Sequence, residues 1–96
     1  IGCATCHPGD PATSKGDFTD HKGHDVGTRG PYDRTEIFFS PTLQECWRTA
    51  PYFHDGRYVT IKEIFTEGQH GSSFGADIES LTNQQVDDLT EYILSL

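Results

Sequence analysis

Residues 3–7 read Cys3-Ala4-Thr5-Cys6-His7, a C-x-x-C-H stretch that decides how so small a chain can fold. On a turn of helix, cysteines three positions apart lie on one face, so both thiols can bond to the two vinyl groups of one porphyrin. The adjacent imidazole of His7 can then reach the iron. This spacing is the attachment signature of c-type haem, and it predicts one covalent haem c with His7 as an iron ligand.

Two other interpretations of this stretch are a redox dithiol and half of a zinc site. A thioredoxin-like dithiol follows a strand in a βαβ unit, whereas only two residues precede Cys3. A structural zinc site needs a second pair of ligands nearby, and the nearest histidines, His21 and His24, follow a loop rich in Gly, Pro and Asp. Haem attachment is therefore the favoured interpretation.

The size of the chain bounds its core. With 96 residues, 33% of them hydrophobic, residues 1–96 suit a single mono-haem domain. A domain this size buries only a modest fraction of its surface, so a haem would add appreciably to the core. No stretch approaches the ~20 apolar residues of a membrane span. The absence of methionine leaves open a processed mature form or a piece of a longer polypeptide.

Charge is distributed unevenly along the chain. All seven Lys and Arg residues lie at or before Lys62, while residues 63–96 carry seven carboxylates. With a net charge of -8, nucleic acid is not an expected partner. The acidic C-terminal third predicts either a docking surface for a redox protein with a basic patch or an ordinary solvated helix face.

The elements expected from the pattern are all helical. Residues 1–7 end a short helix, an irregular loop follows from 9 to about 35, and residues 41–48 form a helix. Capping boxes start helices at Thr60-Ile61-Lys62-Glu63 and Thr82-Asn83-Gln84-Gln85, the first ending at Gly68. Val86, Leu89, Ile93 and Leu96 recur at helical spacing, which predicts an amphipathic C-terminal helix. No alternating strand pattern is present, so the predicted class is all-α.

Several segments resemble the haem domain of the bacterial di-haem cytochrome c peroxidase and methylamine-maturation (MauG-type) family. The resemblance covers nearly the whole chain in order, and its most specific part is a Thr-Ala-Pro-Tyr-Phe-His-Asp-Gly-Arg run. The matching stretches are Phe18-Thr19-Asp20 with His24-Asp25-Val26-Gly27-Thr28, Ser40 to Leu43, Trp47 to Arg57, Thr60 to Ile64, and Leu81 to Leu96.

This resemblance implies a class I cytochrome c-like fold, a periplasmic or extracellular location and haem-based redox work. Family members carry two haem domains, whereas this chain has one C-x-x-C-H motif. It would then be the C-terminal domain of a longer chain, or a domain completed by other haem domains or subunits. The family usually places Met opposite the proximal histidine, and this chain has none. The family position of that ligand falls near His70, which ranks first, with His54 as the alternative.

The remaining candidates are two histidines, one cysteine, three aromatic residues and two arginines, and most of them have two interpretations. His24 belongs to a loop shared with Met-ligated relatives, His21 is expected on the surface, and Cys46 is either an unusual thiolate ligand or a small buried hydrophobe. Trp47, Tyr52 and Phe53 are expected as a packing wall of the haem or as an electron exit. Arg48 and Arg57 either pair with the haem propionates or lie on the surface.

Ligation by two histidines leaves no open site on the iron, so the sequence favours a relay that transfers single electrons to and from redox partner proteins. Without Met, the reduction potential is expected below that of His/Met cytochromes. The alternative is a peroxidase-like haem enzyme in which His70 stays off the iron or leaves it. A third interpretation is a module that serves docking or structure in a larger assembly.

Overall fold

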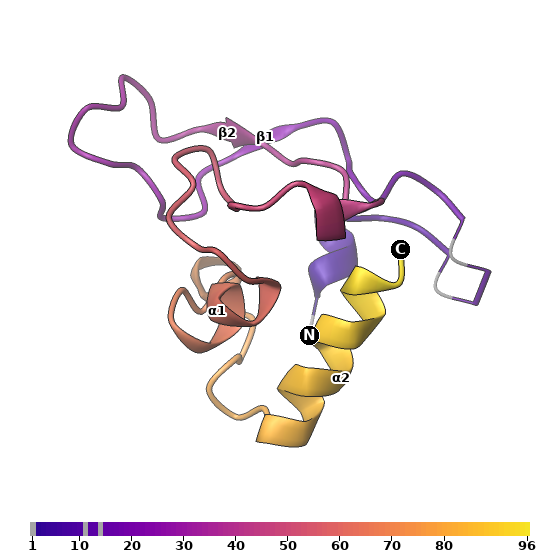
Figure 1. The fold of residues 1–96 in the computed structure, drawn as a ribbon. Coiled ribbons are helices and arrows are strands. Elements are labelled where there is room, and N and C mark those ends of the chain that lie inside the picture. The colour runs from indigo at the N-terminus through magenta and orange to yellow at the C-terminus, as the bar shows by residue number, and fades with distance from the viewer. Residues whose placement is uncertain (1, 11, 14) are drawn as a thin grey trace.

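The computed structural model describes residues 2–10, 12–13 and 15–96. Of the helix end predicted over residues 1–7, Ile1 lies outside the described residues, and Cys3–Thr5 form a 3-10 turn. Two α-helices stand in the C-terminal half, and loops with short 3-10 turns and one strand pair fill the N-terminal half (Figure 1). In chain order the elements are the 3-10 turn η1 (Cys3–Thr5), β1 (Gly23–His24), β2 (Phe38–Phe39), the turn η2 (Cys46–Arg48), α1 (Ile61–Thr66), the turn η3 (Ser72–Phe74) and α2 (Asn83–Leu94).

Both predicted capping boxes start helices where expected. The Thr60 hydroxyl accepts the Glu63 backbone N–H at 3.2 Å and begins α1. At α2 the box is reciprocal, because the Thr82 hydroxyl accepts the Gln85 N–H at 3.1 Å and the Gln85 side chain accepts the Thr82 N–H at 2.8 Å. Each bond satisfies an N–H that has no partner inside the helix.

The core lies between α1, α2 and η2. The predicted stripe of α1 is buried there, as are Val86 and Ile93 of α2, whereas Leu89 is half-buried and Leu96 follows the end of α2. Helix α1 packs across α2 with η2 beside it. The Cys46 thiol is part of this core and points at the Ile93 carbonyl, with sulfur and oxygen 3.8 Å apart. The core cluster consists of Cys46, Ile61, Ile64, Phe65, Ile78, Val86 and Ile93.

The prediction of an all-α, class I cytochrome c-like fold is wrong. β1 and β2 pair antiparallel, with Gly23 opposite Phe39 and His24 opposite Phe38, and α-helix is confined to α1 and α2. Aromatic residues favour strands, and Gly23 leaves room for its neighbour, since a Cβ there would lie 2.6 Å from Ile37 Cγ2. Two-residue strands are too short to show an alternating pattern.

The helix predicted over residues 41–48 is also wrong, because only η2 forms there. Glu45 takes a left-handed φ of 55°, which interrupts a helix. The polar side chains before it bond to the loop instead: Thr42 donates to the Asp17 carbonyl, and Gln44 Nε2 donates to the Gly16 carbonyl at 2.6 Å. Side chains of this kind compete with helix formation.

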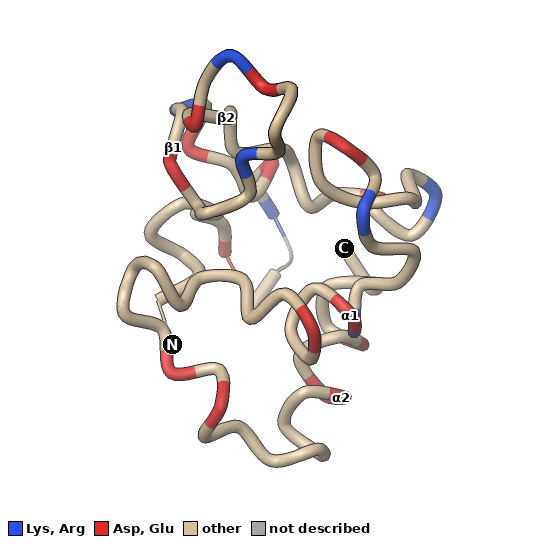
Figure 2. The backbone as a smooth tube through the Cα atoms, turned by 90° about the vertical axis from the view of Figure 1, so that its left-hand side faces the viewer, with Lys and Arg blue, Asp and Glu red and all other residues tan. Residues whose placement is uncertain are grey.

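The uneven charge of the sequence carries over to the structure. The stretch between α1 and α2 carries red acidic segments and no blue ones, and basic residues lie mainly in the loops around β1 and β2 (Figure 2). Among the described residues, none of the helices has both the length and the apolar character needed to cross a membrane.

Replacing Thr82 by alanine tests the cap of α2. The variant loses the bond that the Thr82 hydroxyl accepts from the Gln85 N–H and keeps its own backbone N–H for the Gln85 side chain, so we expect the free energy of unfolding to fall by roughly 1 kcal/mol. Urea denaturation followed by circular dichroism measures it. Glu91→Ala, an exposed change inside the same helix, is the control and should change stability by less than about 0.5 kcal/mol. Equal losses in both variants would contradict the role of the cap.

Candidate functional site

Two histidines from opposite ends of the chain face one another. The ring centres of His7 and His70 lie 6.5 Å apart with an angle of 60° between the ring planes. An imidazole bound at a nitrogen–metal distance of about 2.0 Å has its ring centre about 3.2 Å from the metal. Two imidazoles on opposite sides of one metal ion are therefore about 6.4 Å apart, close to the spacing found here.

His7 is held in a defined tautomer. It follows η1, and its backbone N–H donates to the Cys3 carbonyl at 3.0 Å. Its ring Nδ1 lies 2.8 Å from the Phe18 carbonyl oxygen. A carbonyl can only accept, so Nδ1 carries the proton and Nε2 keeps its lone pair free. This is the arrangement in which a histidine is ready to bind a metal.

His70 is presented by the turn that follows α1. Its backbone N–H donates to the Ile64 carbonyl at 3.1 Å, and the next residue, Gly71, has a φ of 98° that glycine adopts without strain. Its Nδ1 is buried and has no hydrogen-bond partner among the described residues. Burial, with a smaller contribution from His7, lowers the pKa of His70 and keeps the ring neutral.

The two cysteines of the motif lie on the turn that carries His7. In a 3-10 turn, side chains three positions apart eclipse one another, so Cys3 and the residue that closes the turn, Cys6, are on the same side. Both are free thiols, Cys3 exposed and Cys6 half-buried. Burial, followed by the charge of Asp20, raises the pKa of the Cys6 thiol.

A cavity of about 150 Å³ adjoins Cys3 and His7, between η1 and α2. Its wall is mostly apolar, and Phe18, Leu43, Leu89 and Ile93 contribute to it. Gly9 belongs to the same wall, where a Cβ would lie 2.5 Å from the Phe18 ring. The cavity places apolar surface next to the Cys3 thiol and the His7 imidazole, and His70 does not line it.

The structure places the alternative ligand, His54, in other contacts. Its ring stacks on Phe38 with centres 3.8 Å apart, and its Nε2 lies 2.7 Å from the Asp33 carboxylate. Phe53 does reach the histidine pair, with its ring centre 5.2 Å from that of His70. The structure brings His70, and not His54, to His7.

The other predicted residues lie around the site or on the surface. Arg48 pairs with Glu45 at 2.7 Å, and Arg57 pairs with Asp55 at 2.6 Å and donates to the Thr28 carbonyl. Trp47 is exposed, while the Tyr52 hydroxyl donates to the Cys46 carbonyl at 2.8 Å. Propionate binding by the arginines and electron exit through the aromatic residues stay predictions.

Sequence reasoning missed three contributors to this site. The Phe18 carbonyl that orients His7 has no sequence signal, since every residue has a carbonyl. The Ser40 hydroxyl donates to the Cys6 carbonyl at 2.9 Å, from 34 positions away. Asp20 and His24 lie with Cys6 in a group whose ligand atoms are all within 4.8 Å of one another. Three groups do not complete a structural zinc site, which takes four protein ligands.

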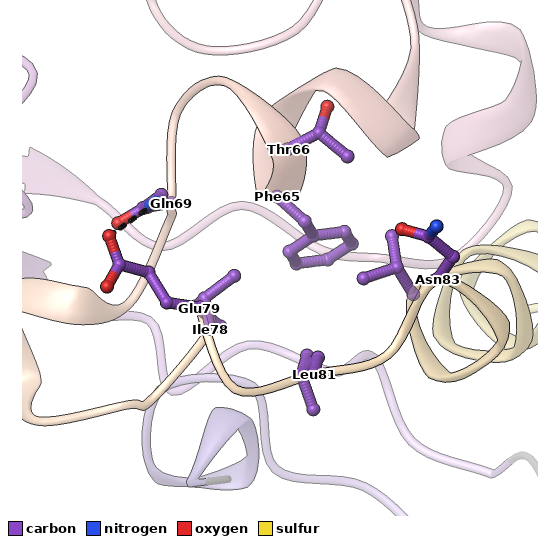
Figure 3. Close-up of a pocket in the computed structure, with 8 residues that line it drawn as sticks. Phe65, Thr66, Gln69, Ile78, Glu79, Leu81 and Asn83 are labelled. Atoms are coloured by element: carbon purple, nitrogen blue, oxygen red, sulfur yellow. Dashed lines mark hydrogen bonds between the residues drawn. The ribbon is translucent and has the colours of Figure 1, made fainter.

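A second cavity, of about 260 Å³, lies between the end of α1 and the start of α2. Figure 3 shows the Phe65 ring pointing into it, and Gln69 and Glu79 lie together at one side, with Gln69 Nε2 3.3 Å from the Glu79 carboxylate. None of the predicted site residues lines this cavity. It therefore takes no part in the arrangement around His7 and His70.

The chain is similar to a known protein in both sequence and fold. It aligns over 131 positions with subunit gamma of hydrazine synthase from Kuenenia stuttgartiensis. The two are 27% identical, and the alignment covers all of this chain and 37% of the relative. This chain is similar to a hydrazine synthase subunit. Because the alignment is longer than the chain, the relative has inserted residues.

The fold comparison agrees with the sequence comparison. A chain in the structure of Kuenenia stuttgartiensis hydrazine synthase pressurised with 20 bar xenon has a TM-score of 0.81 and 26% identity. The match covers 99% of this chain and 41% of that one, so the chain spans about two fifths of the length of these relatives. No family model matches the chain.

These findings correct the family predicted from sequence. The relative that matches is a hydrazine synthase subunit, and no family model matches the chain, so the predicted membership of the di-haem cytochrome c peroxidase and methylamine-maturation family is not supported.

Replacing Gly9 by alanine tests the packing that supports His7. The new methyl would displace the buried Phe18 ring, whose backbone carbonyl orients His7, so we expect the free energy of unfolding to fall by roughly 1–3 kcal/mol. Chemical denaturation measures it. In the control Gly30→Ala, the methyl meets only the Asp33 carboxylate, at 3.2 Å. A Gly9 variant as stable as this control would show that the ring is not confined.

Proposed function

We propose that this chain carries one covalent c-type haem between His7 and His70 and transfers single electrons through it. The observation that carries the proposal is the spacing of 6.5 Å between the two ring centres, with a C-x-x-C-H motif on the turn that presents one of them. The separation is too large for a direct hydrogen bond between the rings and suits one metal ion between them.

The thiols of Cys3 and Cys6 would hold the haem through two thioether bonds. Their place on one side of η1 supports this role, as does the apolar cavity wall beside Cys3. A tether of this kind keeps the ligand His7 at a high effective concentration. The turn thus provides attachment and the first iron ligand from five consecutive residues.

His7 and His70 would be the two axial ligands. His7 Nδ1 donates a hydrogen bond to the Phe18 carbonyl, which leaves Nε2 free and fixes the plane of the ring. A buried ring nitrogen without a partner costs roughly 1–3 kcal/mol, so a histidine at position 70 calls for a role beyond packing. Burial holds this ring neutral, the form that binds metals.

The bound haem supplies reversible one-electron chemistry at its iron. If His7 and His70 both held the iron, the surrounding residues would have no substrate to activate, and their work would be to keep the two histidines in place and water out. The buried side chains of Phe18 and Ile93 would limit the access of solvent to the haem from one side. A fixed surrounding of this kind lowers the reorganisation that accompanies electron transfer.

The similarity to a hydrazine synthase subunit supports a redox role within a larger assembly. We propose that the chain acts as one electron-carrying part of such an assembly, with neighbouring subunits, other haem domains or soluble redox proteins as partners. The acidic stretch between α1 and α2 suits a partner with a basic patch. The periplasmic or extracellular location stays a prediction.

Replacing His70 tests the second ligand. The ferric wild-type protein should show a six-coordinate, low-spin spectrum that cyanide does not change, whereas His70→Gly should become high-spin and bind cyanide. His54→Gln is the matched control and should keep the wild-type spectrum. A wild-type protein that binds cyanide or peroxide readily would favour the peroxidase-like alternative over the relay.

Mass spectrometry of denatured protein tests the attachment. The wild-type chain should retain the mass of one haem, Cys3→Ser and Cys6→Ser should each leave a single thioether, and the double variant should release the haem into acidified organic solvent. Cys46→Ser, which removes the core thiol, should keep two thioethers. Colourless purified protein without added mass would refute the proposed function.

A further inference from the structure

Asp20 and His24 form a hydrogen-bonded pair beside the second cysteine of the motif. His24 Nε2 lies 2.7 Å from the Asp20 carboxylate, and both side chains are largely buried, 21% and 12% exposed. Their ligand atoms lie within 4.8 Å of each other and of Cys6 Sγ. The pair has no part in attaching or ligating a haem, so its place next to the tether needs a separate explanation.

The structure fixes both members of this pair. The Asp20 backbone N–H donates to the Cys6 carbonyl at 3.0 Å, and its carboxylate accepts the Lys22 N–H at 2.9 Å. His24 belongs to β1, and its ring packs edge-on against Phe74 of η3, with centres 5.9 Å apart. Phe74 follows His70 by four residues. The pair therefore touches the turn that carries Cys6 and the turn that follows His70.

Asp20 is a negative charge at this position. Burial opposes its ionisation, but the hydrogen bonds from the Lys22 backbone and from His24 outweigh burial and lower the pKa of the carboxyl. In a poorly solvated environment, the electrostatic interaction of a fixed charge extends over several ångströms with little screening. A carboxylate near an iron stabilises the ferric state over the ferrous one, because the ferrous state carries one positive charge less.

We propose that the Asp20–His24 pair sets the reduction potential of a haem tethered at Cys6, with the Asp20 carboxylate lowering it. This inference rests on the proposed function. One electron from a redox partner protein reduces the ferric iron, and no bond forms or breaks. Asp20 and His24 act through the charge that they place beside the tether, so they are positioning residues.

The chain contains a matched pair for comparison. His21 and Asp17 are also four residues apart, and His21 Nε2 also lies 2.7 Å from the carboxylate of its partner. Their side chains are 73% and 51% exposed, so solvent screens them. The same change in net charge can therefore be made at an exposed position, by Asp17→Asn, and at a largely buried one, by Asp20→Asn.

Spectroelectrochemical titration of the haem-loaded protein tests the proposal. We expect Asp20→Asn to raise the midpoint potential, Asp17→Asn to leave it unchanged, and Asp20→Glu to restore it toward the wild-type value. The shift caused by Asp20→Asn should persist at high salt. Equal shifts in Asp17→Asn and Asp20→Asn, or no shift in Asp20→Asn, would overturn the proposal.

A second measurement needs no variant, in case Asp20→Asn fails to fold. The ring resonances of His24 in the wild-type protein should differ between the oxidised and reduced states, because the unpaired electron of ferric iron is close, and those of His21 should not. Unchanged His24 resonances would overturn the proposal. Failure of the proposed function is recognised separately, since such protein would lack the covalent haem or bind cyanide when oxidised.

Discussion

The structure depends on a small apolar core in its C-terminal half. Seven residues from η2, α1, α2 and the segment before α2 form it, and none of the described residues before Cys46 belongs to it. The N-terminal half is instead attached by polar contacts, such as Thr19 to the Ser40 carbonyl and Ser40 to the Cys6 carbonyl. A chain that buries so little apolar surface has a narrow margin of stability.

The contrast between the apolar core and the polar N-terminal contacts suggests a structural role for the His7–His70 pair. His7 belongs to the polar N-terminal half, and His70 to the turn that leaves the core helix α1. A haem bound by both would join the two halves and add apolar contacts to those that Phe18 already makes in the first half. In the proposed function, cofactor binding and folding are therefore linked, as in other small domains built around a metal.

Burial decides which polar pairs matter. The chain has several ion pairs between neighbours in sequence, such as Arg48 with Glu45, and exposed pairs of this kind contribute little. Asp20 and His24 form the same contact as Asp17 and His21, but at a depth where charge is poorly screened. In the proposal made above, equal geometry at unequal depth would therefore have unequal effects on the reduction potential of the haem.

Local features followed from the sequence alone. Residues 3–7 identified the turn with its two thiols and His7, and the capping boxes placed the starts of α1 and α2, because these signals depend on neighbours within four positions. The tertiary structure decided the rest: the β1–β2 pair, the loss of the helix over residues 41–48, and which histidine lies beside His7. Residues 7 and 70 are 63 positions apart, and only the packing of the chain between them determines that their rings meet.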